Sequence, residues 1–361
     1  MTDLARFVSG EDVSVDVAAI ERSLSEVWRE QSGVSGEPVT RAALWNVVAH
    51  TSTDDEKMHA TQTLGVASAS VPQRSIVIRS SRDGEDELSS WIGANCHLVS
   101  GARQVCSEEI SIVAGGKRVR HVPSLMHALL IPDMPVAAWW LGDLPDDDSD
   151  YVSAILEPAD RLVVDSSHFD HVDDLRLVRR LAEESSTTPA DLNWLRLEDW
   201  RIATASMFDP QPMRERLGRV SSVKIVAGES RSRLFGGRVE ALYFAAWLSS
   251  RLDHHADAGG MFSDRGAIGY DFQMVKAGSE GLLHVEIGFE SGGRVLVERH
   301  DDRAAIIAST ESIPQPLSTV TTHGVKGETD LIVRQLSQRD RDPVFNSILP
   351  RAIELSGRLT C

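Results

Sequence analysis

The feature that most constrains the fold of this chain is the alternation of short apolar strands with helices between residues 41 and 170. Residues 41–50, 73–81 and 134–140 are short segments with an apolar centre, as expected of strands that are covered on both faces. Between the first two, residues 54–68 predict a helix with acidic residues in its first turn, where the helix dipole favours them. Strands that alternate with helices predict an α/β layer with a mixed, mostly parallel sheet covered by helices.

The remaining sequence divides the chain further. A helix is predicted from residue 17 to 30, because apolar residues recur there at helical spacing, and Gly and Pro then break the pattern. The composition changes at "EESSTTPAD", and beyond it strong helices and a run of strands with the hairpin signal "ESGGR" follow. We therefore predict three parts: a helix and linker over 1–40, the α/β domain over 41–185, and an α+β domain with an antiparallel sheet over 186–361.

Charge and composition exclude several classes of partner. The chain has 37 Lys and Arg against 54 Asp and Glu, a net charge of −17. Nucleic acids and anionic membranes require a basic surface, so neither is expected to bind. No apolar run approaches the ~20 residues of a membrane helix, and the N-terminal residues lack the pattern of a secretory signal. With only three cysteines, we expect a cytoplasmic protein whose thiols are reduced.

The stretch "MPVAAWWLGDLPDDDSD" (134–150) is the first candidate for chemistry, because five aspartates follow two tryptophans. Carboxylates bind Mg²⁺ or Ca²⁺, but the spacing does not match an EF-hand loop and no second acidic cluster accompanies it. We interpret the stretch as a buried strand, with Trp139 and Trp140 facing opposite layers, that ends in a solvated acidic turn. The turn lies at the carboxyl end of the strand, where ligands usually bind in α/β sheets, yet its acids would repel phosphate. A candidate partner interface therefore comprises Trp139, Trp140, Asp143, Asp146, Asp147 and Asp148.

The segment "NCHLVSGARQVC" contains two of the cysteines, Cys96 and Cys106. A zinc site would need a tighter cysteine pair. Neighbouring residues on a strand point to opposite faces, so Cys96 and His97 should not act together. The two cysteines could lie opposite each other across a hairpin and form a redox-sensitive disulfide. The alternative is a pair of buried, inert thiols, which is the more frequent case.

Other motifs nominate no catalytic group. The turn after the first predicted strand, "HTSTDDEKMH", is acidic where a phosphate loop would be rich in glycine. "SRSRLFGGR" (230–238) could bind an anion, although a basic loop at the start of a helix is the commoner case. In "LDHHADAGG", His254 and Asp257 could align on a helical turn for a metal, but histidines without further ligands are usually structural. With no GxSxG or HExxH motif either, we predict no cofactor, no metal and no catalytic residue.

Several segments together resemble one family, the glucose-6-phosphate dehydrogenase assembly proteins (OpcA) of cyanobacteria and actinobacteria. The likeness runs in order from "IERSLSEVWRE" through "NCHLVSGARQVCSEEI" to "ADLNWLRLEDWRIATASMFD" and "AAWLSSRL". Its strongest part is "HALLIPDMPVAAWWLGDLP", in which the family pattern is matched by Leu129, Leu130, Pro132, Asp133, Pro135, Trp139, Trp140, Gly142 and Asp143.

The resemblance implies a non-catalytic protein that binds glucose-6-phosphate dehydrogenase, promotes its active oligomer and activates it allosterically in the oxidative pentose phosphate pathway. Cyanobacterial members are also regulated by thiol oxidation. Here the sequence departs from their pattern, because Ser107 follows Cys106 and Cys361 is the only cysteine of the C-terminal half. The alternatives are an α/β enzyme or metabolite sensor for an unknown small molecule, and a scaffold for another partner.

Overall fold

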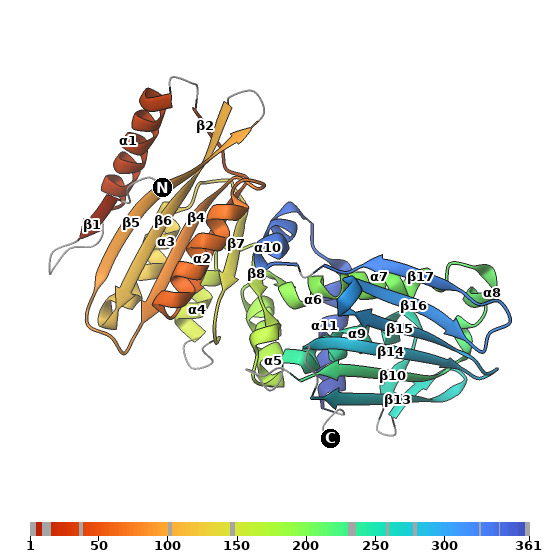
Figure 1. The fold of residues 1–361 in the computed structure, drawn as a ribbon. Helices are drawn as coiled ribbons and strands as arrows, with labels where there is room; N and C mark the ends of the chain where they lie inside the picture. The colour runs from red at the N-terminus through yellow and green to blue at the C-terminus, as the bar shows by residue number, and fades with distance from the viewer. Residues whose placement is uncertain are drawn as a thin grey trace. The chain divides into compact units, whose positions relative to one another are not determined.

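The computed structural model describes residues 5–8, 16–35, 39–99, 103–144, 149–229, 236–257, 260–276, 280–324, 326–338 and 340–357. These residues form two sheets, each within its own compact unit (Figure 1). Unit 1 consists of Met1–Val164, Arg180–Ala190 and Gly327–Arg341, and unit 2 of Asp165–Arg179, Asp191–Lys326 and Asp342–Cys361. The boundary predicted between residues 185 and 186 lies inside the second segment of unit 1.

Sheet A of unit 1 has the strand order β1-β5-β6-β4-β3-β7-β8-β9, with β2 paired to β6. Its strands are β1 (Ala5–Val8), β2 (Val39–Arg41), β3 (Trp45–Thr51), β4 (Gln73–Ser81), β5 (Leu88–Val99), β6 (Arg103–Gly115), β7 (Val136–Trp140), β8 (Arg161–Val164) and β9 (Thr188–Asp191). Strands β6, β4, β3, β7 and β8 are parallel to their neighbours in this series, whereas β5 is antiparallel to both β1 and β6. The mostly parallel sheet predicted from the sequence is confirmed.

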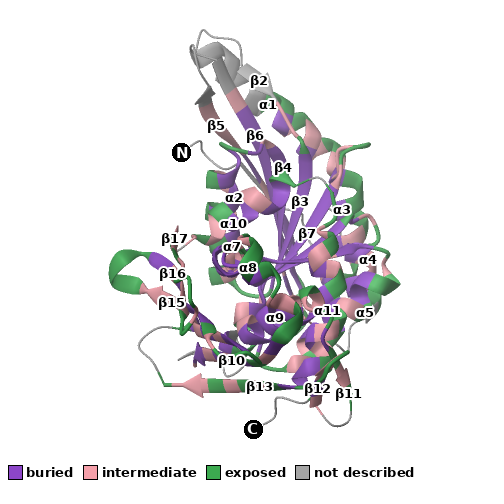
Figure 2. Ribbon diagram, turned by 90° about the vertical axis from the view of Figure 1, so that its right-hand side faces the viewer, coloured by how far each residue is buried: buried purple, intermediate pink, exposed green. Residues whose placement is uncertain are grey.

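Helices cover both faces of sheet A. They are α1 (Val17–Ser35), α2 (Asp54–Ala67), the 3-10 helix η1 (Gly116–His121), α3 (Val122–Leu129), α4 (Ser149–Leu156) and α10 (Glu328–Ser337). Strands β3 and β7 are buried along their whole length, which explains their apolar sequences (Figure 2). Trp139 approaches His59 of α2, whereas His50, beside Trp140, approaches Tyr151 of α4. The two tryptophans therefore face opposite layers, as predicted.

A buried ion cluster fixes α1 to sheet A. Arg74 of β4 donates to Glu108 of β6 at 2.7 Å, and both side chains are only 3% exposed. The same guanidinium donates to Glu21 of α1 at 2.8 Å and to the carbonyl of Leu129 at 2.6 Å. Hydrogen bonds on several sides offset the cost of burying these charges, so the cluster sets where the helix lies on the sheet.

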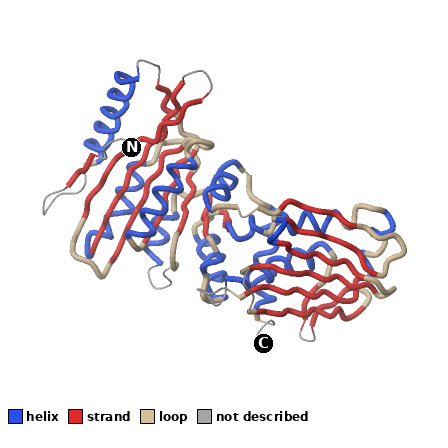
Figure 3. The backbone as a smooth tube through the Cα atoms, in the orientation of Figure 1, coloured by secondary structure: helices blue, strands red, loops and turns tan. Residues whose placement is uncertain are grey.

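Sheet B of unit 2 has the order β11-β12-β13-β10-β14-β15-β16-β17. Its strands are drawn in red in Figure 3. Its strands are β10 (Val220–Gly228), β11 (His255–Asp257), β12 (Gly260–Ser263), β13 (Gly266–Val275), β14 (Gly281–Phe289), β15 (Arg294–His300), β16 (Ala305–Glu311) and β17 (Ser318–Thr322). Apart from the parallel pair β10 and β13, the paired strands are antiparallel, in agreement with the prediction. The central strand β10 was not predicted, although its alternating buried residues Val223, Ile225 and Ala227 are a strand signal.

The helical elements of unit 2 are η2 (Ser166–His168), α6 (Leu192–Arg196), α7 (Glu198–Ser206), α8 (Gln211–Arg214), η3 (Leu217–Arg219), α9 (Gly236–Arg251), η4 (Asp301–Arg303) and α11 (Pro343–Ser356). Helix α5 (Val172–Glu184) contributes to both units. Helix α9 packs on β10 and β14 and is itself contacted by α11. Helices α6 and α7 follow each other directly and are separated by Leu197.

Candidate functional site

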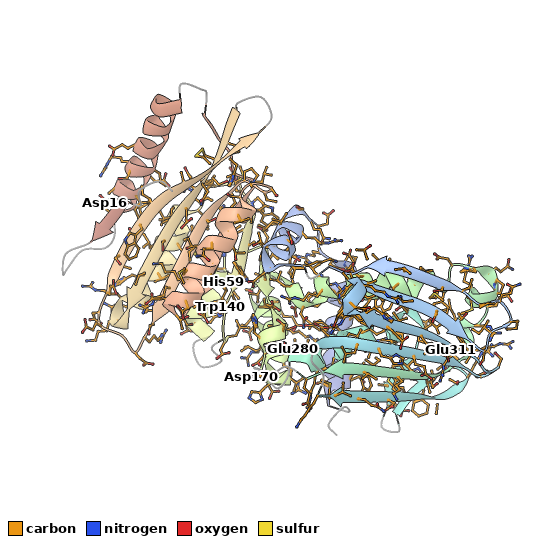
Figure 4. The ribbon with its side chains drawn as sticks, viewed as in Figure 1. Asp16, His59, Trp140, Asp170, Glu280 and Glu311 are labelled. Carbon is orange, nitrogen blue, oxygen red and sulfur yellow. A yellow bond between two sulfur atoms is a disulfide. The ribbon has the colours of Figure 1, made fainter. Side chains whose placement is uncertain are left out.

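The carboxyl edge of sheet A is the first place to look for a site. Strand β4 follows β3 in the chain and lies on one side of it, whereas β7 lies on the other side. The strand order therefore reverses between β3 and β7, and such switch points bind the ligands of open α/β proteins. His50 and Trp140 are paired near the carboxyl ends of these two strands (Trp140 is labelled in Figure 4).

An aromatic stack occupies this edge. The rings of His50 and Trp140 lie 3.8 Å apart between centroids at an interplanar angle of 18°. The Nε2 atom of His50 is hydrogen-bonded to Ser80 Oγ of β4 at 2.9 Å. Burial lowers the pKa of His50 to about 3, so the imidazole is neutral at physiological pH. A neutral, packed histidine holds the three strand ends together and gives an anion no charge to bind.

The turn from β3 to α2 also disfavours an anion. Glu56 Oε2 accepts the backbone N–H groups of Ser52 at 2.8 Å and Thr53 at 3.2 Å, completing a capping box at the start of α2. A carboxylate of the protein thus lies where a phosphate would bind to a helix N-terminus. Gly142 closes the edge: its φ is +72°, and a Cβ there would approach Glu56 Oε1 to 2.7 Å. The structure therefore gives a physical reason for the acidic turn sequence.

The predicted partner interface is only partly a surface. Trp139 and Trp140 are 1% and 2% exposed, so placing them on a partner-facing surface was wrong. Their size and apolar character suit the sheet core, which sequence alone does not distinguish from an interface. Asp143 is exposed, and its carbonyl accepts the indole N–H of Trp140 at 3.2 Å. Asp146, Asp147 and Asp148 lie outside the described residues.

Cys96 and Cys106 are direct partners in the β5–β6 pairing and form a disulfide, with a Cα–Cα distance of 4.0 Å. Of the two alternatives, the structure has the disulfide and not the pair of inert thiols. The close approach follows from the hairpin register, which the sequence did not fix. His97 is instead hydrogen-bonded to Ser68 at 2.9 Å through its Nε2, so Cys96 and His97 do not act together.

In the other candidate segments, the described residues form no metal site. His254 follows the end of α9 and is buried, with its Nδ1 atom 3.1 Å from the Tyr270 hydroxyl. Asp257 belongs to β11 and not to a helical turn, so the proposed alignment of the two residues is wrong. Within the described part of the chain, no group of three or more His, Cys, Asp or Glu side chains could hold a metal ion. In the basic segment 230–238, residues 230–235 lie outside the described residues.

Unit 2 contains a polar cavity of about 340 Å³ that sequence reasoning missed. Its charged and ionisable lining consists of Arg196, Glu240, Glu280, Arg299, His323 and Lys326 (Glu280 is labelled in Figure 4). These residues come from α6, α9, the start of β14, the end of β15 and the segment after β17. Because they are dispersed over more than a hundred residues, no local motif could have identified them.

A buried carboxylate orients one wall of this cavity. Asp165 accepts two hydrogen bonds from Arg196, at 2.7 and 2.6 Å, and its side chain is 5% exposed. Burial alone would raise the pKa of Asp165, but the hydrogen bonds and charge of Arg196 outweigh burial and lower it. The nearby Asp191 accepts from the Tyr243 hydroxyl at 2.7 Å. Burial and the charge of Asp165 raise the pKa of Asp191 to about 6.

Asp199 binds two ionisable side chains of the cavity lining, His323 and Lys326. Its carboxylate oxygens lie 3.1 Å from His323 Nδ1 and 3.0 Å from Lys326 Nζ. Glu240 Oε2 accepts the N–H of Leu282 at 2.8 Å. Burial raises the pKa of Glu240 against the opposing effects of that hydrogen bond and of Arg196. The cavity therefore combines fixed donors with fixed acceptors, an arrangement that can bind a polar molecule.

Comparison with known proteins gives two family-model matches in chain order. Residues 65–181 match the glucose-6-phosphate dehydrogenase subunit N-terminal domain, and residues 187–349 match the C-terminal domain of the same subunit. A putative OxPP cycle protein OpcA of Synechocystis sp. is 27% identical over 187 residues, covering 51% of this chain and 38% of that protein. The Nostoc punctiforme protein of the same name is 29% identical over 174 residues, covering 47% and 36%. The chain thus matches less than half the length of these curated relatives.

Solved structures of similar shape are more distant. A putative oxidoreductase from Magnetospirillum magnetotacticum has a TM-score of 0.48 and 11% identity, covering 88% of this chain and 99% of its own. A 3-ketoreductase from Actinomadura kijaniata, in complex with TDP-benzene and NADP, has a TM-score of 0.49 and 10% identity, covering 87% and 96%. At these values the likeness indicates neither a shared activity nor a shared ligand. Among the described residues, no helix is both long and apolar enough to cross a membrane.

Proposed function

Since this chain belongs to the glucose-6-phosphate dehydrogenase assembly protein family, OpcA, we propose that it binds glucose-6-phosphate dehydrogenase as a non-catalytic partner. We further propose that it promotes the active oligomer of that enzyme and activates it allosterically in the oxidative pentose phosphate pathway. The observation that carries the proposal is the match of both family domains, in order, across most of the chain. The description of both domains names glucose-6-phosphate dehydrogenase as the enzyme of which they form a subunit.

The carboxyl edge of sheet A supports a non-catalytic role. The switch point between β3 and β7, where α/β enzymes commonly bind a nucleotide, holds the His50–Trp140 stack. Beside it, the carboxylate of Glu56 caps the helix whose N-terminus would otherwise receive a phosphate. A nucleotide would have to displace packed aromatic rings and approach a fixed negative charge.

Activation by such a partner has a definite energetic requirement. The protein must bind the active conformation or oligomer of the dehydrogenase more tightly than the inactive one, and its effect cannot exceed that difference. A coupling free energy of about 1–3 kcal/mol corresponds to a roughly 5- to 150-fold change in apparent affinity. We therefore expect the apparent KM of the dehydrogenase for glucose 6-phosphate to fall by a factor in this range.

The experiment uses the glucose-6-phosphate dehydrogenase of the same organism. The two proteins are mixed and separated by size-exclusion chromatography, and initial rates are measured over a range of glucose 6-phosphate concentrations with and without this chain. Co-elution together with a lower KM supports the proposal. Heat-denatured protein at the same concentration is the control, because it removes the folded surface and keeps the composition. Separate elution and unchanged kinetics would exclude the role.

We also propose that the acidic segment 143–148, which follows β7 in the sequence, contributes to the partner surface. Asp143 is exposed at the carboxyl edge of sheet A, and Asp146, Asp147 and Asp148 follow it in the sequence. A run of like charges attracts a basic patch at long range and speeds association more than it adds affinity. Salt should therefore weaken the complex.

The second candidate function is that of a metabolite sensor, and the polar cavity of unit 2 favours it over an enzyme of sheet A. Thermal unfolding of the chain alone with NADP⁺, sugar phosphates and nucleotides tests this candidate. Stabilisation by one of these compounds, without any effect on the dehydrogenase, would replace the assembly role by a sensor role.

A further inference from the structure

We propose that the cavity of unit 2 binds a small polyhydroxylated metabolite that carries one anionic group, a phosphate or a carboxylate. The inference goes beyond the assembly role, because it assigns a ligand to the chain itself and is tested without the dehydrogenase. The volume of the cavity, about 340 Å³, lies at the small end of the range of ligand sites, roughly 300–1,000 Å³. That size suits a molecule like a monosaccharide derivative better than a dinucleotide.

The cations of the lining are held in place by carboxylates that do not themselves line the cavity. Asp165 holds Arg196 with two hydrogen bonds, and Asp301 lies 2.9 Å from Arg299 Nε. Arg299 also donates from Nη1 to the carbonyl of Glu280 at 2.8 Å. An arginine has five N–H donors, so each guanidinium keeps donors beyond those that position it. Donors fixed in advance lose little conformational entropy when a ligand binds.

Lys326 is positioned in the same way from another side. Its Nζ atom lies 3.0 Å from Asp199 and 3.4 Å from Glu198, and its side chain is 26% exposed. His323 shares the Asp199 carboxylate through Nδ1, which leaves the opposite ring nitrogen, Nε2, for another partner. Two arginines, a lysine and a histidine thus line one cavity of a chain whose net charge is −17. This concentration of donors is what an anionic group requires.

The acceptors of the lining exclude a bare anion as the complete ligand. Glu240 and Glu280 also line the cavity and would repel a phosphate or carboxylate placed against them. Hydroxyl groups satisfy such carboxylates, because each hydroxyl can donate to an oxygen and accept from a neighbouring N–H. The carboxylates that hold the cations also reduce the attraction for a simple anion. A ligand that combines hydroxyls with one anionic group can therefore hydrogen-bond both the carboxylates and the cations of the lining.

Trp200 adds an aromatic component. Trp200 is 1% exposed and lines the cavity. An indole N–H is a hydrogen-bond donor only, so a ligand oxygen placed against it would be an acceptable partner. We expect the fluorescence of this tryptophan to change when the cavity is occupied.

The test is isothermal titration of the purified chain, without dehydrogenase, with glucose 6-phosphate, gluconate, glucose and inorganic phosphate. We expect the first two compounds to bind and the last two to bind at least about tenfold more weakly, because each of those satisfies only part of the lining. The ratio of the affinities for glucose 6-phosphate and gluconate shows whether the cavity prefers a phosphate or a carboxylate as the anionic group. Equal binding of glucose and glucose 6-phosphate would overturn the proposal, as would the absence of any heat at millimolar ligand.

Variants locate the binding. Arg299→Gln and Lys326→Gln should each weaken binding of glucose 6-phosphate about tenfold, because each removes charge-assisted hydrogen bonds. Arg303→Gln is the matched control, since Arg303 is 66% exposed and does not line the cavity. It should bind like the original chain. Lys326→Gln is the less demanding change for folding, and circular dichroism checks each variant. Binding that survives both cavity substitutions would place the ligand elsewhere and contradict the proposal.

Discussion

His50 lies flat against Trp140 across two neighbouring parallel strands, with the ring centroids 3.8 Å apart. The contact explains why a histidine lies near the end of β3: its imidazole packs at the sheet edge as an aromatic ring and is hydrogen-bonded to Ser80. Burial disfavours the charged form of the imidazole and lowers the pKa of His50 to about 3. The stack therefore makes the stability of unit 1 depend on pH.

Replacing His50 by Gln should remove part of that dependence. In the unfolded chain a histidine takes up a proton near pH 6.5, whereas His50 in the folded chain does so only near pH 3. Acidification from about pH 6.5 to about pH 3 therefore favours the unfolded state. The stabilisation of the folded state by neutral His50 is fully present above about pH 6.5. Between pH 7 and pH 5, His50 should account for about 2 kcal/mol of lost unfolding free energy. Urea unfolding at both pH values measures the difference between the original chain and His50→Gln. His171→Gln, at an exposed position, is the control, and an identical pH response in His50→Gln would contradict the assignment.

The disulfide should contribute to stability, because Cys96 and Cys106 close a hairpin whose ends are 10 residues apart. The loop-entropy relation gives about 2–3 kcal/mol for a loop of this size. We expect Cys96→Ser together with Cys106→Ser to lower the urea midpoint, and reductant to lower it only in the original chain. Maleimide labelling after denaturation without reductant should modify Cys361 alone, and all three cysteines after reduction. Labelling of all three without reduction would instead favour free thiols.

Gly237 is required for the close approach of α9 to β10. A Cβ at this position would lie 2.3 Å from the carbonyl oxygen of Gly228, and a backbone atom cannot move aside cheaply. Gly237→Ala should therefore lower the unfolding free energy by about 1–3 kcal/mol, although alanine normally favours a helix. Gly218→Ala is the control, because its Cβ would meet nothing within 4 Å. Equal thermal stability of the two variants would show that α9 can shift.

Replacing Asp146, Asp147 and Asp148 by Asn tests the acidic segment 143–148. The substitutions should slow association with the dehydrogenase and make it less sensitive to salt, because a local negative field is removed. Surface plasmon resonance at two salt concentrations measures both effects. Asp264→Asn, Glu290→Gln and Asp302→Asn combined remove the same charge from exposed turns of unit 2. Equal loss of association rate in both triple variants would attribute the effect to net charge and not to the acidic segment.

The candidate sites show where the sequence was informative. The separation of Trp139 and Trp140 onto two faces followed from strand alternation. Whether a tryptophan is buried in a core or exposed at an interface depends on what packs over it, so the interface prediction for these two residues failed. The cavity of unit 2 was missed because Arg196 and Lys326 approach it from segments 130 residues apart.

The sequence by itself determined the local structure of this protein: the apolar run at 134–140 became a strand, and the acidic first turn of α2 marked a helix start. These features depend on residues that are close together in the sequence, so their spacing can be identified without the structure. Only the tertiary structure decided that His50 meets Trp140, that Cys96 meets Cys106, and that carboxylates behind the unit 2 cavity fix its cations. Such contacts depend on register and on the packing of distant segments, where one residue of slip changes every partner.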